Sequence, residues 1–334
     1  MLLTGFKITF KRVLILSILL GALLGALLVT IKLQYILEQK IPFNETQRTF
    51  VINKGDSLYK VLDRLEESHG IEGTSWLRLR YIFRESPVIK AGRYTIHRDS
   101  KLGTLIDRFE AGDVEKFKFT IIEGTVAKNN LEKLEQFLLD NNLPFEVPKK
   151  VVEIFSSEAS VLPDTYFFSD EEDLIKVLED SRISLQEYAE SMWKQKPFDN
   201  PLKSISEALV LASIIEREAL LSSEQTIIAS VFLTRLTKGM KLQADPTSSY
   251  GYYKDYGERI GRAVLDDENE FNTYVINGLP PSPICFPSKG AIEAAILSSP
   301  GEYEYFVAKG DGSHIFSKTY EEHKKAVKKY IYPK

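Results

Sequence analysis

Residues 204–220 read SISEALVLASIIEREAL, an apolar stretch that carries a carboxylate near its end. Ser204 and Glu207 have the spacing of a capping box, which predicts that a helix begins there. At 100° per residue, Glu216 falls inside an apolar arc of this helix, whereas Glu218 points to another side. The other members of that arc are Ile205, Ala208, Leu209, Ala212, Ala219 and Leu220.

A carboxylate in this position has two interpretations. Ionising a carboxyl group on an apolar face costs free energy unless the charge is paired, so the position would favour the protonated acid. A protonated acid is the form that general acid catalysis needs, which makes Glu216 a catalytic candidate. A structural glutamate bonded to a backbone amide or to an arginine would fit the same pattern, and the pattern alone leaves both interpretations open.

Composition limits the class of protein. The chain has 334 residues, enough for about two domains. A net charge of -4 argues against a binder of nucleic acid, and the lysines near the C-terminus are interpreted as the solvent-exposed face of a last helix. The single cysteine, Cys285, excludes an internal disulfide, and no Cys or His spacing predicts a metal site. No cofactor is predicted.

The N-terminal part carries a candidate membrane span. Val13–Ile31 is an uninterrupted run of 19 apolar or small residues, which at 1.5 Å per residue just crosses a hydrocarbon core of roughly 30 Å. Lys7, Lys11 and Arg12 precede it, so residues 1–12 are expected to form a cytoplasmic tail and residues 13–31 a single transmembrane helix. The rest of the chain would be exported. A cleaved signal peptide is the alternative.

A polar linker, residues 32–47, is expected to lead into a small α+β domain over residues 48–120. Its predicted elements are a strand at residues 49–52, a helix capped by Ser57, a short helix across residues 76–83, a strand at residues 92–96, a helix ended by Gly112 and a strand at residues 117–121. No catalytic constellation falls within this domain, so binding or spacing is its expected role.

Residues 121–334 are predicted to form a mixed α/β domain. The helix at residues 204–220 is followed by a second apolar helix that ends at Gly239, and the short turn between them indicates a helical hairpin at the base of a cleft. A β-hairpin and a helix begun by Thr319 close the chain.

Three loops of this domain gather polar and aromatic side chains. Residues 158–168 contain Glu158 and Asp164, residues 242–251 contain Gln243 and Asp245, and residues 271–283 contain Asn272 and Tyr274. Mixtures of carboxylates, amides and rings suit sugars, which offer apolar faces and hydroxyl rims. These six residues are expected to line a groove for a polar substrate above the helical hairpin. Ordinary loop structure, including turn chemistry around Pro163 and Asp164, is the alternative.

Five short stretches of the second half have an order and spacing typical of one enzyme family. They are ASIIERE at residues 212–218, LQADPT at 242–247, FNTY at 271–274, GLPP at 278–281 and GSHIF at 312–316. Together they resemble the endolytic murein transglycosylases, the MltG or YceG-like family. The resemblance runs from the membrane segment to nearly the last residue. It implies that residues 48–120 are similar to LysM peptidoglycan-binding modules, that residues 121–334 form the YceG-like catalytic domain, and that Glu216 is the catalytic glutamate.

The resemblance also implies a reaction. The β-1,4 bond between N-acetylmuramic acid and N-acetylglucosamine would be cleaved within glycan strands, without water, leaving 1,6-anhydromuramoyl ends and terminating nascent strands. Glu216 would protonate the leaving oxygen and then take the proton of the muramoyl C6 hydroxyl. The implied setting is the cytoplasmic (inner) membrane, with peptidoglycan strands as substrate and peptidoglycan synthases, the penicillin-binding proteins, as the partner class.

One stretch departs from the family pattern, and two other functions stay open. Where the family has Glu-Gly, this chain has Glu158 and Ala159, and Leu162 precedes the proline. If that glycine has positive φ, Ala159 adds strain or reshapes the loop around Glu158. A lysozyme-like hydrolase would use a second carboxylate to activate water or to attack the sugar. A membrane-tethered scaffold that binds peptidoglycan would have no activity.

Overall fold

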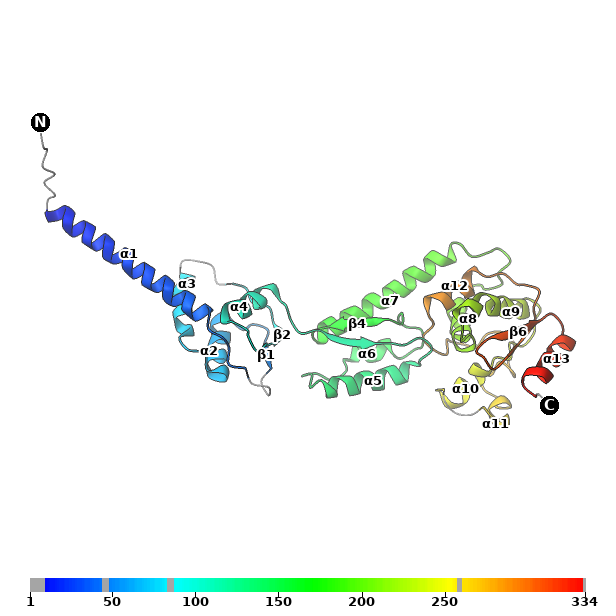
Figure 1. Ribbon diagram of the computed structural model, residues 1–334. Helices are drawn as coiled ribbons and strands as arrows, with labels where there is room; N and C mark the ends of the chain where they lie inside the picture. Colours follow the sequence, from blue (N-terminus) through cyan, green and yellow to red (C-terminus); the bar gives the residue numbers. More distant parts are fainter. Residues whose placement is uncertain (1–9, 44–47, 83–86, 257–259, 333–334) are drawn as a thin grey trace, which may run out of the picture. The chain divides into compact units, whose positions relative to one another are not determined.

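The computed structural model describes residues 10–43, 48–82, 87–256 and 260–332. It is a mixed α/β structure in which helices dominate (Figure 1). The chain divides into two compact units, residues 1–116 and residues 117–334. Residues 1–9, which include Lys7 and most of the predicted cytoplasmic tail, lie outside the described residues.

The first unit begins with a long apolar helix, α1 (Phe10–Leu37). Its stretch Lys11–Leu37 is long and apolar enough to cross a membrane, judged by length and composition. Apolar side chains along this stretch are exposed, as expected of a helix that meets lipid rather than a protein core. The helix continues past Ile31, where the predicted span ends.

The stretch predicted as a linker, residues 32–47, is partly helical and partly core. Its first residues extend α1, and residues 44–47 lie outside the described part. Ile36 and Ile41 are buried in the hydrophobic core of the first unit, with Leu33 packed against them. The stretch was predicted as a linker because most of its residues are polar. Among its apolar residues, Leu33, Ile36 and Leu37 recur at helical spacing and face the core.

A two-stranded sheet and short helices complete the first unit. β1 (Thr49–Ile52) pairs antiparallel with β2 (Gly92–Thr95). The helical elements are α2 (Leu58–His69), the 3-10 turn η2 (Thr74–Trp76), α3 (Leu77–Ile82) and α4 (Leu102–Ala111). Ser57 caps α2, and Gly112 ends α4 in the left-handed conformation, both as predicted. The predicted short helix is split into η2 and α3, and its expected end at Phe83 lies outside the described residues.

The strand predicted to end the small domain belongs instead to the second unit. β3 (Phe117–Thr120) pairs antiparallel with β4 (Thr165–Phe168), which lies far along the chain. A strand's alternating pattern predicts its two faces but not its partner, so the sequence placed it with its neighbours. Around these strands pack α5 (Ala127–Asp140), α6 (Lys149–Ile154) and α7 (Glu171–Trp193), with a shared core that includes Phe119, Leu134 and Phe168.

The rest of the second unit is built around α8 (Ile205–Glu218), which begins at the predicted residue and is capped by Ser204. The 3-10 turn η3 (Ser222–Glu224) leads into α9 (Gln225–Thr237), and α8 also packs against α12 (Lys289–Leu297). β5 (Tyr305–Ala308) and β6 (His314–Ser317) form the predicted hairpin, and the Thr319 capping box opens α13 (Tyr320–Tyr330).

Two expectations for this region are wrong. The stretch predicted as a loop after Leu242 is largely the helix α10 (Asp245–Tyr253), followed by the short α11 (Arg262–Leu265). The apolar arc of α8 was expected to be its buried face, but burial does not follow this arc. Residues 210–215 are buried on every side of the helix, whereas Leu220, a member of the arc, is 79% exposed. Helices α7, α9, α10 and α12 surround α8, so position along the helix decides burial more than position around it.

Candidate active site

Glu216 lies in the last turn of α8 and is half-buried. Its Oε2 accepts two hydrogen bonds from Ser288, one from the backbone N–H at 3.0 Å and one from the hydroxyl at 2.5 Å. Ser288 is the N-cap of α12, and its hydroxyl also accepts a hydrogen bond from the N–H of Ala291. In the described part of the chain, both hydrogen bonds to Glu216 fall on Oε2, which leaves Oε1 for a ligand.

The loop before Ser288 is tied to α8 and fixes this geometry. Ser213 accepts a hydrogen bond from Ile284 N–H at its hydroxyl, and its carbonyl accepts one from the Cys285 thiol. Phe286 exchanges backbone hydrogen bonds with the loop at Gly124 and Thr125. A buried helix and two interlocked loops therefore hold the donors that meet Glu216.

Arg217 covers one side of the site. Its guanidinium lies 3.8 Å from the centroid of the Tyr256 ring, and its Nη1 donates to the carbonyl of Gly124 at 3.2 Å. Tyr256 in turn donates from its hydroxyl to the carbonyl of Ile284 at 2.7 Å. Gly124 has φ +73°, and a Cβ there would lie 3.3 Å from Arg217 Nη1 and 3.8 Å from Glu216 Cγ. The positive φ and the close approach to Arg217 both favour glycine at this position.

Glu158 is a second carboxylate in the same neighbourhood. Its Oε2 accepts from Ala127 N–H at 2.8 Å and its Oε1 from the Tyr250 hydroxyl at 3.2 Å. Burial raises the pKa of Glu158 to about 7, although both hydrogen bonds oppose the shift. The charges of Glu158 and Glu216 both act on the buried Cys285, whose pKa burial raises well above its ordinary value. The Cys285 thiol therefore stays protonated and unreactive near neutral pH.

Ala159 has the positive φ under which the sequence predicts strain or a reshaped loop around Glu158. Ala159 has φ +52°, so a non-glycine residue occupies the left-handed region where the family pattern has glycine. Ala159 is buried, and it directly follows Glu158. The strain lies in the backbone that carries the Glu158 side chain.

Glu218 faces a different set of groups from Glu216, as predicted. Burial, and then the negative charge of Asp245, raise the pKa of half-buried Glu218 to about 8, against the opposing charges of Arg235 and Arg217. Asp245 begins α10 and accepts a hydrogen bond from the Tyr274 hydroxyl at 2.6 Å. The Glu218 carboxyl group therefore keeps its proton near neutral pH.

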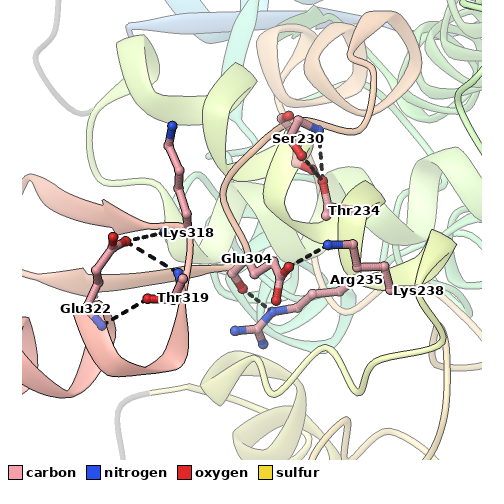
Figure 2. Close-up of polar contacts among 9 residues, drawn as sticks. Ser230, Thr234, Arg235, Lys238, Glu304, Lys318, Thr319 and Glu322 are labelled. Atoms are coloured by element: carbon pink, nitrogen blue, oxygen red, sulfur yellow. Dashed lines mark hydrogen bonds and ion pairs between the residues drawn. The ribbon is translucent and has the colours of Figure 1, made fainter.

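Arg235 is the buried cation of this second group. It extends from α9, donating from Nε to the carbonyl of Glu304 at 2.7 Å and from Nη1 to the carbonyl of Leu242 at 2.7 Å. Figure 2 shows its side chain directed toward Glu304, whose carboxylate also pairs with Lys238. The same view shows Thr234, one residue earlier on α9, bonded to Ser230 within the helix. The Thr234 hydroxyl also contacts the carbonyl of Gly301, in the loop before β5. These contacts hold α9, the loop at Leu242 and β5 together.

The predicted groove residues separate into different environments. Asp245 and Gln243 are exposed, half-buried Tyr274 bonds to Asp245, and Gln243 has φ +49°. Asp164 is exposed at the start of β4, where its carboxylate accepts from the N–H of the next residue, which is turn chemistry.

Asn272 is 0% exposed, which corrects its expected place on a groove wall. Its amide donates to the carbonyls of Leu265 and Asp267, and its Oδ1 accepts from Ser248 and from Tyr274 N–H. With its hydrogen-bonding capacity used inside the protein, Asn272 shapes the loop rather than facing a ligand.

Several residues of the site escaped the sequence analysis. Ser288 and Tyr256 bond or stack with residues of the site across long sequence separations, and nothing in their local sequence marks them. Tyr250, whose hydroxyl bonds to Glu158, lies in the stretch 242–251 that was predicted to line the groove, but it was not named as a site residue. Arg235 did leave a signal, because an arginine inside an apolar helix needs buried partners. Within the described ranges, no group of three or more His, Cys, Asp or Glu side chains is arranged to hold a metal ion.

The sequence matches a known protein family. The family described as YceG-like matches residues 50–329, which include every site residue named above. The chain belongs to the YceG-like family. It is 30% identical over 323 residues to a relative from Bacillus subtilis named endolytic murein transglycosylase, with 87% of each chain covered. A Streptococcus pneumoniae relative of the same name is 23% identical, and the match covers 89% of this chain but 61% of that one.

A solved structure agrees with the YceG-like family. The crystal structure of a yceG-like protein from Listeria monocytogenes shares a TM-score of 0.52 and 25% sequence identity with this chain. It covers 83% of this chain and 97% of its own. The likeness therefore extends over most of the length of both YceG-like chains.

Proposed function

We propose that this protein is an endolytic murein transglycosylase in which Glu216 is the acid and the base. Relatives of that name share most of the chain's length, including one that is 30% identical. The observation that carries the proposal is the hydrogen bonding of the Glu216 carboxylate. Its Oε2 accepts two hydrogen bonds from Ser288, and its Oε1 is left for a ligand. A single carboxylate fixed in this way suits a reaction in which one group moves the proton twice.

The reaction needs no water. Protonated Glu216 gives its proton to the glycosidic oxygen as the bond from that oxygen to muramoyl C1 breaks. Glu216, now a carboxylate, takes the proton from the C6 hydroxyl as O6 bonds to C1 and closes the 1,6-anhydro ring. The two Ser288 donors stabilise the carboxylate that exists between these steps, and the proton returned from O6 restores the starting acid.

Glu158 distinguishes this proposal from a hydrolase. A hydrolase needs a second carboxylate that is ionised and free to attack the sugar or to activate water. Both oxygens of Glu158 accept hydrogen bonds from the protein, and burial raises its pKa to about 7. Because both oxygens are already engaged, neither is free to attack the sugar or to activate water, so we assign Glu158 to shaping and binding the sugar site.

The substrate-binding surface that we propose uses Asp245, Tyr274 and Gln243. Asp245 and Gln243 are exposed, and Asp245 is bonded to half-buried Tyr274. Carboxylate, phenol and amide groups together bind sugar hydroxyls and acetamido groups. Asp164 stays a weaker candidate because its carboxylate already serves a turn.

The setting that we propose is the cytoplasmic membrane. α1 would cross it once, with the N-terminus in the cytoplasm, because Lys11 and Arg12 precede the apolar run. Residues 48–116 would act as a LysM-like module that raises the local concentration of glycan strands, and the helical pair α8 and α9 would carry the catalysis. Peptidoglycan synthases are the proposed partner class, since a cut in nascent strands is made where strands are made.

Product mass spectrometry tests the function. The full chain in detergent is incubated with purified sacculi, and the released glycans are weighed. We expect 1,6-anhydromuramoyl ends, which lack one water relative to reducing ends. Reducing ends would identify a hydrolase, and no release at all would leave a peptidoglycan-binding scaffold.

A further inference from the structure

The end of α1 is built into the first unit. Ile36 is 0% exposed in the core of that unit, and it lies in the same unbroken helix as the apolar run that ends at Ile31. Backbone hydrogen bonds from Leu102 N–H to the Gln39 carbonyl and from Ile41 N–H to the Ser100 carbonyl fix the following residues. At 1.5 Å per residue, the unit's core begins about 7 Å past the apolar run.

A recess opens beside these last turns of α1. It measures about 600 Å³, and it is lined by Lys32 and Tyr35 on the helix and by Glu72, Gly73 and Trp76 on the turn after α2. Figure 1 shows α3, which follows this turn, beside the same end of α1. If residues 13–31 fill the hydrocarbon core, as our proposed function has it, the recess lies at the level of the lipid headgroups.

Aromatic rings at the recess match that level. Tyr35 is 63% exposed and Trp76 is 42% exposed, although both are large rings in a unit with a well-filled core. Tyr and Trp gather where one side of the ring meets apolar chains and the other meets polar headgroups. Their exposure is explained if lipid covers them.

The charges of the recess are of both signs. Glu38 pairs with Lys101 and Lys40 pairs with Asp99, so these charges are already satisfied. Among the described residues, Lys32 has no carboxylate partner and lies over the Tyr35 ring at 5.4 Å. The Glu72 carboxylate likewise has no partner within the described ranges, although its backbone carbonyl accepts from Gln39. One open cation and one open anion line the same recess.

We propose that this recess binds the headgroup of a membrane aminophospholipid. Lys32 contacts the phosphate, Glu72 accepts hydrogen bonds from the primary ammonium, and the rings of Tyr35 and Trp76 cover the glycerol region. A choline headgroup carries the same charges but has no N–H to donate, so Glu72 discriminates against it. Because α1 enters the unit without a break, a bound headgroup seats the first unit on the bilayer surface.

Depth-dependent quenching tests the placement. The chain has two tryptophans, Trp76 and Trp193. The Trp193→Phe full chain is placed in nanodiscs that carry a nitroxide either on the headgroup or deep in the acyl chains. We expect the headgroup nitroxide to quench Trp76 more than the deep nitroxide does. Equal quenching by the two nitroxides, or stronger quenching by the deep one, overturns the proposal.

Lipid retention tests the chemistry. The full chain is extracted from bilayers of equal phosphatidylethanolamine and phosphatidylcholine, and the co-purified lipids are counted by mass spectrometry. Retention should favour phosphatidylethanolamine by about 1.5- to 5-fold, the range of one exposed charge pair. Glu72→Leu, which has no hydrogen-bond acceptor, should abolish this preference, and Lys32→Gln should lower retention of both lipids. No preference in the unmodified chain contradicts the proposal.

These results are separable from the proposed enzyme function. A chain that fails to enter nanodiscs contradicts both the membrane anchor and the headgroup site, whereas its cleavage of sacculi in detergent is unaffected. A chain that enters nanodiscs but leaves Trp76 unquenched contradicts the headgroup site alone. Loss of sacculus cleavage with intact quenching contradicts the enzyme assignment alone.

Discussion

Ser288 donates to Glu216 twice, from its N–H at 3.0 Å and from its hydroxyl at 2.5 Å, and both bonds fall on Oε2. The same hydroxyl accepts from Ala291 N–H at 3.2 Å and so caps α12. One side chain therefore starts a core helix and orients the candidate catalytic carboxylate. The stability of α12 and the geometry of the site are coupled through it.

Ser288→Ala should weaken both roles. Loss of the cap should lower the free energy of unfolding by about 1 kcal/mol. Loss of a hydrogen bond to a charged group, typically about 1.5–3 kcal/mol, should lower turnover by about 10- to 100-fold. Ser288→Thr keeps a hydroxyl and is the matched control. Thermal melts and glycan release are measured for both variants, and equal activity in the two would remove the proposed role of the hydroxyl.

Gly124→Ala should lower turnover as well as stability, because the positive φ is not its only constraint. At φ +73° an alanine costs about 1–2 kcal/mol, and its Cβ would also press on Arg217 Nη1 at 3.3 Å. Gly310→Ala, at φ +92° with nothing within 4 Å, imposes similar strain in open space. We expect comparable losses of stability in denaturant melts but a loss of turnover only in Gly124→Ala. Similar turnover in the two variants would show that Arg217 does not matter to the site.

Glu218 predicts a pH-dependent stability. Its folded pKa of about 8 lies above the ordinary 4.5, so between these values the native state binds more protons than the unfolded state. The protonated Glu218 carboxyl group therefore makes its full contribution to the free energy of unfolding below about pH 4.5, and this contribution is lost as the pH rises toward 8. Glu218→Gln lacks this titration and should gain stability relative to the unmodified chain between pH 5 and 9, on the order of 1–3 kcal/mol. Parallel curves of unfolding free energy against pH for the two chains would refute the shift.

Tyr274 and Asn272 should respond differently to substitution. Tyr274→Phe removes the hydroxyl that bonds to Asp245 at 2.6 Å, on the proposed substrate-binding surface. We expect reduced turnover with little change in melting temperature. Asn272→Ala leaves two partly buried carbonyls and a buried hydroxyl without a partner, at up to about 1–3 kcal/mol each, so its activity should fall in step with stability. The opposite pattern in either variant would reverse the assignment.

Local chemistry explains what could be predicted from the sequence. Ser57, Ser204 and Thr319 cap helices where they were expected, because a cap is a contact with a residue three positions away. The helix α10 was missed because Asp245 and Pro246 were interpreted as loop residues. Proline in fact suits the first turn of a helix, where its missing N–H costs nothing.

Tertiary contacts explain what could not be predicted. The helical pattern singled out Glu216, but the predicted apolar arc is not the reason for its half-buried state, since α8 is buried all round over residues 210–215. The groups that define its environment are Ser288, 72 residues later, and the loop at Gly124. The raised pKa of Glu218 likewise depends on tertiary contacts, because Asp245 and Arg235, whose charges act on it, come from other helices. No local pattern carries such information.

The most direct test of the central claim is the release of 1,6-anhydromuramoyl glycans from sacculi by Glu216→Gln. Glutamine keeps the shape and can still contact Ser288, but it cannot give or take the proton. We expect a loss of at least about 10²–10⁴-fold with an unchanged fold by circular dichroism. Glu187→Gln, the same change at an exposed position on α7, should retain full activity. Substantial anhydro-glycan release by a folded Glu216→Gln chain would contradict the assignment of Glu216 as the acid and base.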